Sequence, residues 1–333
     1  MIELWCMQKY IVNDNESGQT LEKYVKKVLS TAPLSFIYKL FRKKDIKVNG
    51  HWQKEKYVVT GGEEVTIFVS DEQMEDFKNK VTYQANNQIE PWIIYEDKNV
   101  LFINKPRGVL VQKDDNYNEK PLDQMVIEYL IYKGEYDPQN DLAFKPGPAH
   151  RIDRNTSGIV IFGKNHDSLA YLFELFQKHE LIGKHYICLV TGDIDKEGTV
   201  EVPLRKNYDT KKVVVAPISS GAKKAKTVYH PIERFGDFTL LDITLITGRT
   251  HQIRVHMSYI RHHVVGDGKY GDFKVNNQIE KEYGFTNQFL HASEVHFGQL
   301  KKPLENLSKR SFKASMPEEY TNLLNKLRDR TKE

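Results

Sequence analysis

The fold and function of this chain are indicated most strongly by the stretch His150-Arg151-Ile152-Asp153-Arg154-Asn155-Thr156-Ser157-Gly158, which the apolar run Ile159-Val160-Ile161-Phe162 follows directly. That run is typical of a buried strand, so the stretch before it forms a loop at the strand's edge. The loop holds Asp153 between two arginines, and nearby positive charge favours an ionised carboxylate. Because such loops often carry chemistry, we interpret Asp153 as a functional acid that meets a polyanion. The alternative is an ordinary turn, in which Asp before Thr-Ser-Gly is common.

The length and composition predict a globular protein of two domains. The chain has 333 residues, of which 39% are hydrophobic and 28% charged, as in proteins with a packed core. No apolar run approaches the roughly 18 residues of a membrane helix, and the N-terminus lacks the pattern of a signal peptide. The two cysteines, Cys6 and Cys188, form no metal-binding cluster. We therefore expect reduced thiols in a cytoplasmic protein without membrane attachment.

The net charge of +4 is unevenly distributed. From Lys39 to Lys56, lysines and arginines far outnumber acidic residues, and from Arg205 to Lys226 the single acid is Asp209. Two basic clusters far apart in sequence predict two contact surfaces for a phosphate backbone. The alternative for either cluster alone is a solvated, lysine-rich loop.

The N-terminal part predicts a small α/β module. Apolar residues recur at helical spacing over 21–29, and a second helix is expected over Leu34–Lys43 with Pro33 in its first turn. Ile46–Val48 then alternates as a strand, Asn49-Gly50 indicates a tight hairpin turn, and a further strand covers residues 64–69.

This pattern resembles the S4 RNA-binding domain, a helix pair followed by a short strand platform. The most diagnostic pieces are Phe36-Ile37-Tyr38-Lys39-Leu40, Ile46-Lys47-Val48-Asn49-Gly50 and Gly61-Gly62-Glu63-Glu64-Val65. The resemblance implies that the second helix lays Lys39, Arg42 and Lys43 on RNA phosphates. The alternative is a helix and hairpin with an ordinary solvated face. We expect an S4-like domain over residues 14–70 and a polar linker over 71–88, with a short helix near Met74–Phe77.

Residues 89–328 predict a larger α+β domain, in which strands and helices alternate and strands then dominate. Its sheet is expected to be mixed and mainly antiparallel, with a central cleft. The expected strands lie near residues 100–103, 186–190, 213–215, 227–231, 239–246 and 290–297. The expected helices lie near residues 122–130, 169–176 (capped by Asp167), 251–260 and after Pro317.

Four segments of the larger domain carry its candidate chemistry. They are the Asp153 loop, Asn104-Lys105-Pro106-Arg107-Gly108, Lys184-His185-Tyr186 and Thr247-Gly248-Arg249-Thr250-His251-Gln252-Ile253-Arg254-Val255-His256. Together they resemble the RluA family of pseudouridine synthases, and the layout is closest to RluC-like members with an N-terminal S4 domain. The resemblance covers nearly the whole chain, and its two longest motifs are specific.

The resemblance implies an isomerase that converts uridine in RNA to pseudouridine. The bond from ribose C1′ to uracil N1 breaks, the base turns, and C5 bonds to C1′. Nothing is added or removed, so we expect no cofactor, small-molecule partner or metal. His150, His251 and His256 have no Cys or carboxylate at ligand spacing, and we expect them to be structural.

The resemblance also assigns three catalytic residues. Asp153 matches the family's essential aspartate, Arg254 the arginine that pairs with it, and Tyr186 the tyrosine that stacks on the base. A carboxylate beside C1′ can stabilise positive charge, attack as a nucleophile or take a ribose proton. The sequence leaves these three roles open.

The remaining candidates contact the substrate. Arg151 matches the residue that fills the gap left by the flipped base, and Ile253 supplies an apolar contact on the base's other face. Lys105 and Arg107 are assigned to phosphate or loop contacts. The implied partner is large-subunit ribosomal RNA, bound by a monomer. Two alternatives are a catalytically silent RNA-binding or ribosome-assembly protein and a hydrolase of the N-glycosidic bond.

Overall fold

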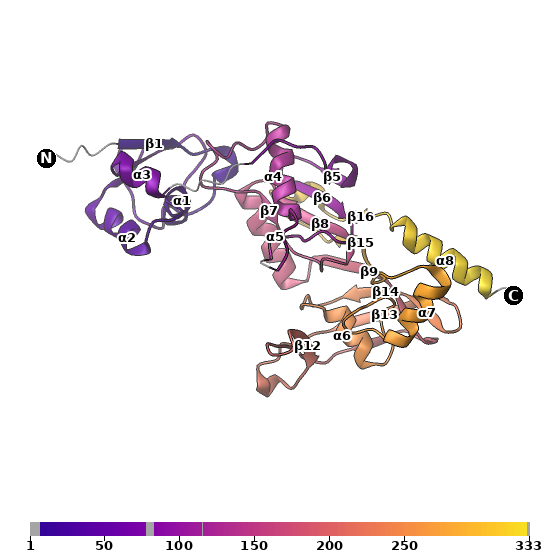
Figure 1. Cartoon of the computed structure of the whole chain (residues 1–333). Helices are drawn as coiled ribbons and strands as arrows, with labels where there is room; N and C mark the ends of the chain where they lie inside the picture. Colours follow the sequence, from indigo (N-terminus) through magenta and orange to yellow (C-terminus); the bar gives the residue numbers. More distant parts are fainter. Residues whose placement is uncertain (1–6, 78–82, 115, 332–333) are drawn as a thin grey trace.

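The computed structural model describes residues 7–77, 83–114 and 116–331, and it builds two units on separate sheets. The smaller unit, at the left of Figure 1, contains a four-stranded sheet, and the larger unit contains a ten-stranded sheet and ends in helix α8. Residues 78–82, in the middle of the predicted linker, lie outside the described part of the chain.

The four-stranded sheet has the order β1-β4-β2-β3 and is antiparallel throughout. Its strands are β1 (Met7–Ile11), β2 (Ile46–Val48), β3 (His51–Trp52) and β4 (Glu64–Phe68). The turn between β2 and β3 is the predicted one, and both Asn49 and Gly50 have the positive φ that such a two-residue turn requires. Because β1 pairs with β4 along its whole length, this unit begins before residue 14.

Three helices complete the smaller unit: α1 (Leu21–Val28), α2 (Leu34–Lys43) and α3 (Asp71–Phe77). The prediction of a helix over Leu34–Lys43 is confirmed, with Pro33 at its N-cap. Leu21, Ile37 and Met74 lie in one buried apolar cluster with the sheet. Helix α3 therefore belongs to this core and extends beyond the short helix expected there.

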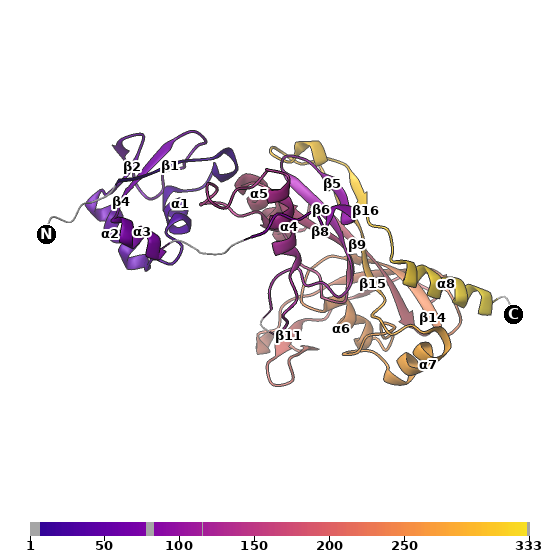
Figure 2. The same cartoon turned by 45° about the horizontal axis from the view of Figure 1, so that its top comes forward.

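The two units contact each other through polar groups around residues 137–145. The backbone N–H of Ala143 donates to Glu16 Oε1 at 2.5 Å, and Gln19 donates to the Ala143 carbonyl at 3.2 Å. Asn13 Nδ2 donates to Asp141 at 2.9 Å. Figure 2 shows this segment reaching the smaller unit beside α1.

The ten-stranded sheet is mixed and mainly antiparallel, as predicted. Its main path runs β10-β13-β14-β9-β15-β8-β6-β5, with β16 beside β15 and β7 beside β8. Only β15 and β8 are parallel among the paired strands of the described residues. The strands are β5 (Ile93–Glu96), β6 (Val100–Lys105), β7 (Gly147–Pro148), β8 (Ser157–Gly163), β9 (Ile182–Thr191), β10 (Gly198–Val200), β13 (Thr227–Arg234), β14 (Phe238–Leu245), β15 (Leu290–Phe297) and β16 (Ser311–Lys313). A separate two-stranded hairpin consists of β11 (Leu204–Asn207) and β12 (Lys212–Val215).

Helices pack on both faces of this sheet. Successive side chains of a strand point to opposite faces, so one strand can contribute to both cores. Leu101 and Ile103 of β6 share a core with α4, whereas Val100 and Phe102 share a core with α5. The helices of the larger unit are α4 (Leu122–Tyr132), α5 (His166–Lys178), α6 (Gln252–Tyr259), α7 (Phe273–Tyr283) and α8 (Glu318–Arg330), with short 3-10 turns at Glu90–Trp92, Ile218–Ser220 and Glu305–Leu307.

Two sequence-based expectations about helices need correction. The cap of α5 is Asn165, whose side chain accepts the N–H of Ser168 at 2.9 Å, and Asp167 lies inside the first turn. Helix α7 was not predicted, because Ile279 is its one buried residue. A helix that buries so little shows weak apolar periodicity.

Candidate active site

A pocket of about 210 Å³ lies between the Asp153 loop, strand β9 and the start of α6. It brings together Arg151, Asp153, Tyr186, Ile253 and Arg254. These residues come from three of the four segments that carried the candidate chemistry. The pocket therefore corresponds to the cleft that was expected in the middle of the sheet.

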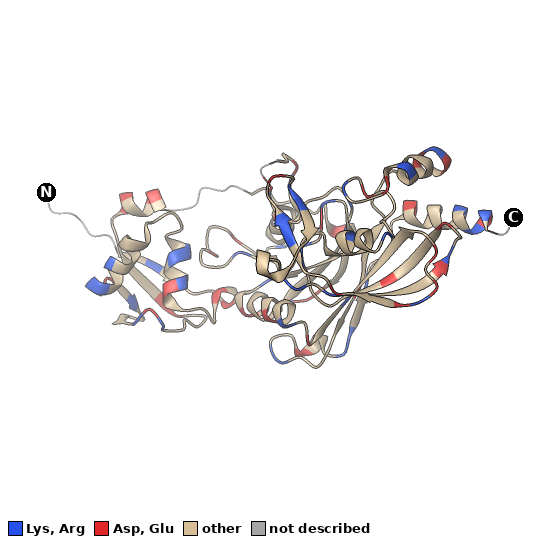
Figure 3. Ribbon diagram, turned by 90° about the horizontal axis from the view of Figure 1, so that it is seen from below, with Lys and Arg blue, Asp and Glu red and all other residues tan. Residues whose placement is uncertain are grey.

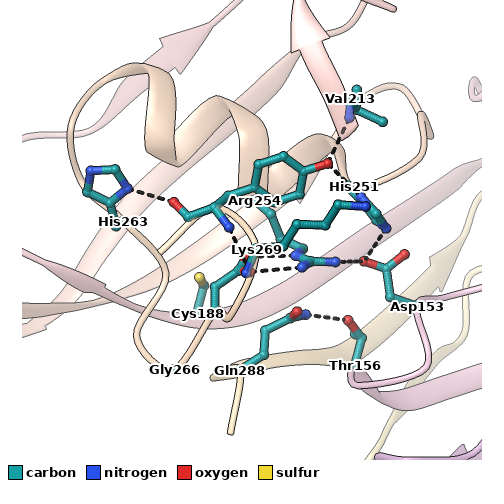
Figure 4. Close-up of polar contacts among 12 residues, drawn as sticks. Asp153, Thr156, Cys188, Val213, His251, Arg254, His263, Gly266, Lys269 and Gln288 are labelled. Atoms are coloured by element: carbon teal, nitrogen blue, oxygen red, sulfur yellow. Dashed lines mark hydrogen bonds and ion pairs between the residues drawn. The ribbon is translucent and has the colours of Figure 1, made fainter. Parts of the chain in front are cut away.

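Asp153 and Arg254 form a direct ion pair, although they are far apart in sequence. Arg254 Nη1 donates to Asp153 Oδ2 at 2.8 Å (Figure 4). The side chain of Asp153 is 24% exposed and that of Arg254 is 9% exposed. The Asp153 carboxylate is thus accessible from the pocket, whereas the Arg254 guanidinium is largely buried in the pocket's lining.

Arg254 is held from its other side by Asp267, for which the sequence suggested no role. Arg254 Nε and Nη2 donate to the two oxygens of Asp267 at 2.7 and 2.8 Å. Asp267 is fully buried and also accepts the backbone N–H groups of Lys269 and Tyr270 at 2.8 and 3.1 Å. Such two-point pairing fixes the plane of the guanidinium as well as its position.

Electrostatics keep this buried pair ionised. Burial opposes both charges, but the hydrogen bonds and charge of Asp267, followed by the charge of Asp153, raise the pKa of Arg254. Burial likewise opposes ionisation of Asp267, yet Arg254 and the two backbone N–H groups lower its pKa. The guanidinium consequently presents a fixed positive charge to Asp153.

His251 is a second neighbour of the Asp153 carboxylate. It caps α6 with a left-handed backbone, φ 52°, and its Nε2 lies 3.8 Å from Asp153 Oδ2. Its Nδ1 lies 2.8 Å from the hydroxyl of Tyr270, whose ring packs 5.1 Å from the Arg254 guanidinium. Burial lowers the pKa of His251. The ring is therefore neutral near pH 7 and serves as a hydrogen-bonding group.

Tyr186 and Ile253 supply the apolar part of the pocket. Tyr186 lies on β9 and Ile253 in the first turn of α6, and both are buried in the core that α4 and α6 share with the sheet. Burial, followed by the charge of Asp153, raises the pKa of Tyr186 well above its ordinary value. Its phenol stays neutral, so the ring offers a flat face of the kind that stacks on a nucleobase.

The Asp153 loop is fixed against strand β15. Gln288 donates to Thr156 Oγ1 at 2.9 Å, and Thr156 N–H donates to the Asp153 carbonyl at 3.1 Å. Gly158 has φ +110°, and a Cβ placed on it would lie 2.2 Å from the carbonyl oxygen of Ala292. Glycine is thus required where β8 approaches β15, immediately after the loop.

Lys105 and Arg107 contact protein groups. Lys105 is fully buried, and its Nζ donates to the carbonyls of Pro106, Val109 and Arg154 at 2.9, 2.8 and 3.2 Å. A phosphate contact by Lys105 is therefore wrong, and its role is the alternative one, a loop contact. Arg107 donates to Glu319 and Asn287, each at 2.6 Å, which also fixes it between segments of the chain.

The other predicted contact residues are exposed. Arg151 lies at the mouth of the pocket. Lys39, Arg42 and Lys43 project from α2 in the smaller unit and are not part of the pocket. Within the described residues, no cluster of His, Cys, Asp and Glu could hold a metal ion. His150 instead accepts the N–H of Ile161 at 3.2 Å and stacks on Phe176.

An arginine-bound carboxylate beside a tyrosine face can stabilise positive charge on a sugar next to a stacked base, which is the chemistry of a nucleoside-modifying enzyme. Residues 99–259 match the family model described as RNA pseudouridylate synthase. The chain belongs to this family, in its RluA branch, and is an isomerase that acts on RNA.

Curated relatives agree with this assignment, and a solved structure shares the fold. An "Uncharacterized RNA pseudouridine synthase" of Mycoplasma capricolum is 32% identical over 91% of this chain and 95% of its own. A "Ribosomal large subunit pseudouridine synthase C" of Vibrio cholerae is 31% identical over 86% of this chain and 87% of its own. The structure of human "RNA Pseudouridylate Synthase Domain Containing 4" matches with a TM-score of 0.58 at 22% identity, covering 72% of this chain and 94% of that one. Among the described residues, no helix is long and apolar enough to cross a membrane.

Proposed function

We propose that this enzyme isomerises specific uridines of large-subunit ribosomal RNA, with Asp153 as the carboxylate that meets ribose C1′. The observation that carries the proposal is the Arg254–Asp153 ion pair at 2.8 Å, with its carboxylate open to a pocket that also contains the ring of Tyr186. The ribosomal target is supported by the names of relatives such as the Vibrio cholerae protein.

The chemistry assigns one task to each group. The target base leaves its stack, and Arg151 at the pocket mouth occupies the vacated space. Tyr186 and Ile253 hold the uracil between them. The C1′–N1 bond breaks, the base turns, C5 bonds to C1′, and the hydrogen on C5 leaves as a proton while N1 gains one. Asp153 compensates the positive charge that develops at C1′, and Arg254 holds the Asp153 carboxylate in place through its hydrogen bond at 2.8 Å.

The smaller unit fits a role in RNA binding. It combines a helix pair with a short antiparallel sheet, and Lys39 and Arg42 are exposed on α2. We assign residues 14–70, together with β1 and α3, to an S4-like RNA-binding domain, the rest of the segment up to residue 88 to a linker and 89–328 to the catalytic domain. Phosphate contacts of this kind supply affinity that falls steeply with salt.

The test is release of tritium from large-subunit ribosomal RNA that carries uridine labelled at C5. The wild-type protein is expected to release tritium and to leave the RNA chain intact, whereas Asp153→Asn releases none and binds the RNA with nearly unchanged affinity. Mapping of pseudouridines in ribosomal RNA from cells with and without the protein then identifies the target. Release of free uracil would point to glycosidic hydrolysis, and tritium release by Asp153→Asn would remove Asp153 from the mechanism.

A further inference from the structure

The basic hairpin β11–β12 lies against the helix that carries Arg254. Leu204 and Val213 of the hairpin share a small apolar cluster with Val255 of α6, and Tyr270 packs on the same cluster. Lys269 Nζ donates to the Lys211 carbonyl at 2.5 Å. Arg205, Lys206, Lys211 and Lys212 give this hairpin its charge, and Lys and Arg are prominent on it in Figure 3. The hairpin therefore carries a basic surface and packs on α6, the helix whose first turn lines the pocket.

Two hydrogen bonds connect the hairpin to His251, and the far side of the His251 ring faces Asp153. The backbone N–H of Val213 donates to the Tyr270 hydroxyl oxygen at 2.8 Å, and that hydroxyl lies 2.8 Å from His251 Nδ1. The opposite ring nitrogen of His251, Nε2, faces Asp153 Oδ2 at 3.8 Å. Figure 4 shows Val213, His251 and Asp153 in this sequence along the dashed lines.

The directions of these hydrogen bonds follow from their donors. An amide N–H can only donate, so the Tyr270 oxygen accepts from Val213. Among the described residues, the acceptor within hydrogen-bond distance of the Tyr270 O–H proton is then His251 Nδ1. A neutral histidine that accepts at Nδ1 carries its proton on Nε2. The proton of His251 consequently points at Asp153. The opposite tautomer would turn a lone pair towards the carboxylate.

We propose that Tyr270 is a positioning residue that couples the hairpin β11–β12 to Asp153 by fixing the tautomer of His251. The proposal rests on the proposed function, because it takes RNA as the ligand of the hairpin, whose Val213 N–H already donates to Tyr270 in the free protein. His251 and Arg254 then both act on Oδ2 of Asp153, which leaves Oδ1 for ribose C1′. RNA that reaches the pocket without contacting the hairpin meets a less ordered carboxylate, so the hairpin contributes to substrate selection.

The groups around His251 agree with a neutral ring. Asp153 and Asp267 favour its protonation, whereas burial, Arg254 and Lys269 oppose it. These charges come from the Asp153 loop, from α6 itself and from the segment after α6. Because the ring is neutral, only one of its two nitrogens carries a proton, and the contact with the Tyr270 hydroxyl selects which one.

The first test is ¹⁵N NMR of the histidine side chains in the wild-type protein, with His251→Gln to assign the signals. Protonated Nε2 and unprotonated Nδ1 are expected for His251, and a mixture of tautomers in Tyr270→Phe. Phenylalanine keeps the ring beside Arg254 and removes only the hydroxyl. Protonated Nδ1 in the wild-type protein would overturn the proposal without any variant.

The second test measures turnover at saturating RNA by tritium release. Tyr270→Phe is expected to lower kcat about tenfold, the effect of one hydrogen bond, with RNA affinity within about twofold. The matched control is Tyr259→Phe, which removes the hydroxyl of an exposed tyrosine at the end of α6 and for which no change is expected. A normal kcat in Tyr270→Phe would contradict the proposal while leaving the isomerase activity established.

The third test is a double-mutant cycle between the hairpin and Tyr270. Lys206→Gln with Lys212→Gln is expected to lower both RNA affinity and kcat in the wild-type background, but only RNA affinity in the Tyr270→Phe background. Coupling of this kind distinguishes a shared pathway from two independent losses. Additive effects on kcat would show that the hairpin contributes binding alone, and an absence of tritium release from every protein, wild type included, would instead contradict the proposed function.

Discussion

Two aspartates share one arginine, and their surroundings differ in a way that separates structure from chemistry. Asp267 is fully buried and accepts four hydrogen bonds, two from Arg254 and two from backbone N–H groups. Asp153 is 24% exposed, and Arg254 reaches one of its oxygens. A carboxylate with four donors has little capacity for a new partner, whereas one that faces a pocket retains it. The difference shows that Asp267 holds the arginine, and it supports the proposal that Asp153 meets the substrate.

The largest expected effect is on turnover. Asp153→Asn removes the charge that would face C1′ and leaves Arg254 paired with Asp267, so turnover is expected to fall at least about 1,000-fold. The free energy of unfolding is expected to change by less than about 1 kcal/mol, because the lost pair is partly exposed. Tritium release and urea unfolding measure the two quantities. A large loss of stability would show that Asp153 has a structural role like that of Asp267.

The reverse pattern is expected for the buried aspartate. Asp267→Asn leaves the Arg254 charge buried with one carboxylate instead of two, and breaking such a pair costs about 3–5 kcal/mol of stability. Turnover should fall as well, because the guanidinium is no longer held in its plane. Urea unfolding monitored by circular dichroism gives the first value. The matched control is Asp242→Asn, which removes the β14 aspartate of a partly exposed pair with His185 of β9 and should cost much less.

Acid titration tests how Asp267 contributes to stability. Arg254 and the two backbone N–H groups lower the pKa of Asp267 against the effect of burial, so the native state binds a proton there less readily than the unfolded chain. The stability from this group is complete above the ordinary carboxyl pKa of about 4 and is lost as pH falls through the lowered native pKa. The difference in unfolding free energy between wild type and Asp267→Asn should therefore shrink below pH 4, by about 1 kcal/mol per pH unit at most. A difference that stays constant down to pH 3 would contradict the assignment.

The smallest effect is expected from an exposed ion pair of similar geometry. Arg107 Nε lies 2.6 Å from Glu319 Oε1, but both side chains are about a third or more exposed, at 40% and 34%. Arg107→Ala should cost less than about 1 kcal/mol and should leave RNA affinity close to wild type. Filter binding at two salt concentrations checks the affinity. A tenfold loss with a reduced salt dependence would restore Arg107 as a phosphate contact.

The sequence predicted the parts of the fold and of the site that depend on local pattern or on the family resemblance. It placed a helix over Leu34–Lys43 and a turn at Asn49-Gly50, and the Asp153–Arg254 contact that it implied is present at 2.8 Å. The role of Asp267 was not predicted, because a loop motif does not show which side chain turns inward. The same is true of Lys105, whose carbonyl acceptors come from Pro106, Val109 and Arg154 and converge only in the folded chain.

The cap of α5 and the helix α7 were missed for local reasons. Asn165 and Asp167 are both good capping residues two positions apart, and the choice depends on the backbone of Asn165 at φ −141°. Helix α7 presents mostly polar residues and buries only Ile279, so tertiary contact rather than periodicity specifies it.

The parallel pairing of β8 with β15 has a consequence for how the enzyme is made. Ser157 pairs with His291 and Gly158 with Ala292, so the strand that anchors the Asp153 loop is synthesised long after the loop itself. Domains form during translation only when their contacting segments have left the ribosome, and contacts of such separation form slowly. The loop of a nascent chain is therefore not anchored until β15 has been synthesised, and the pocket can form only after that point.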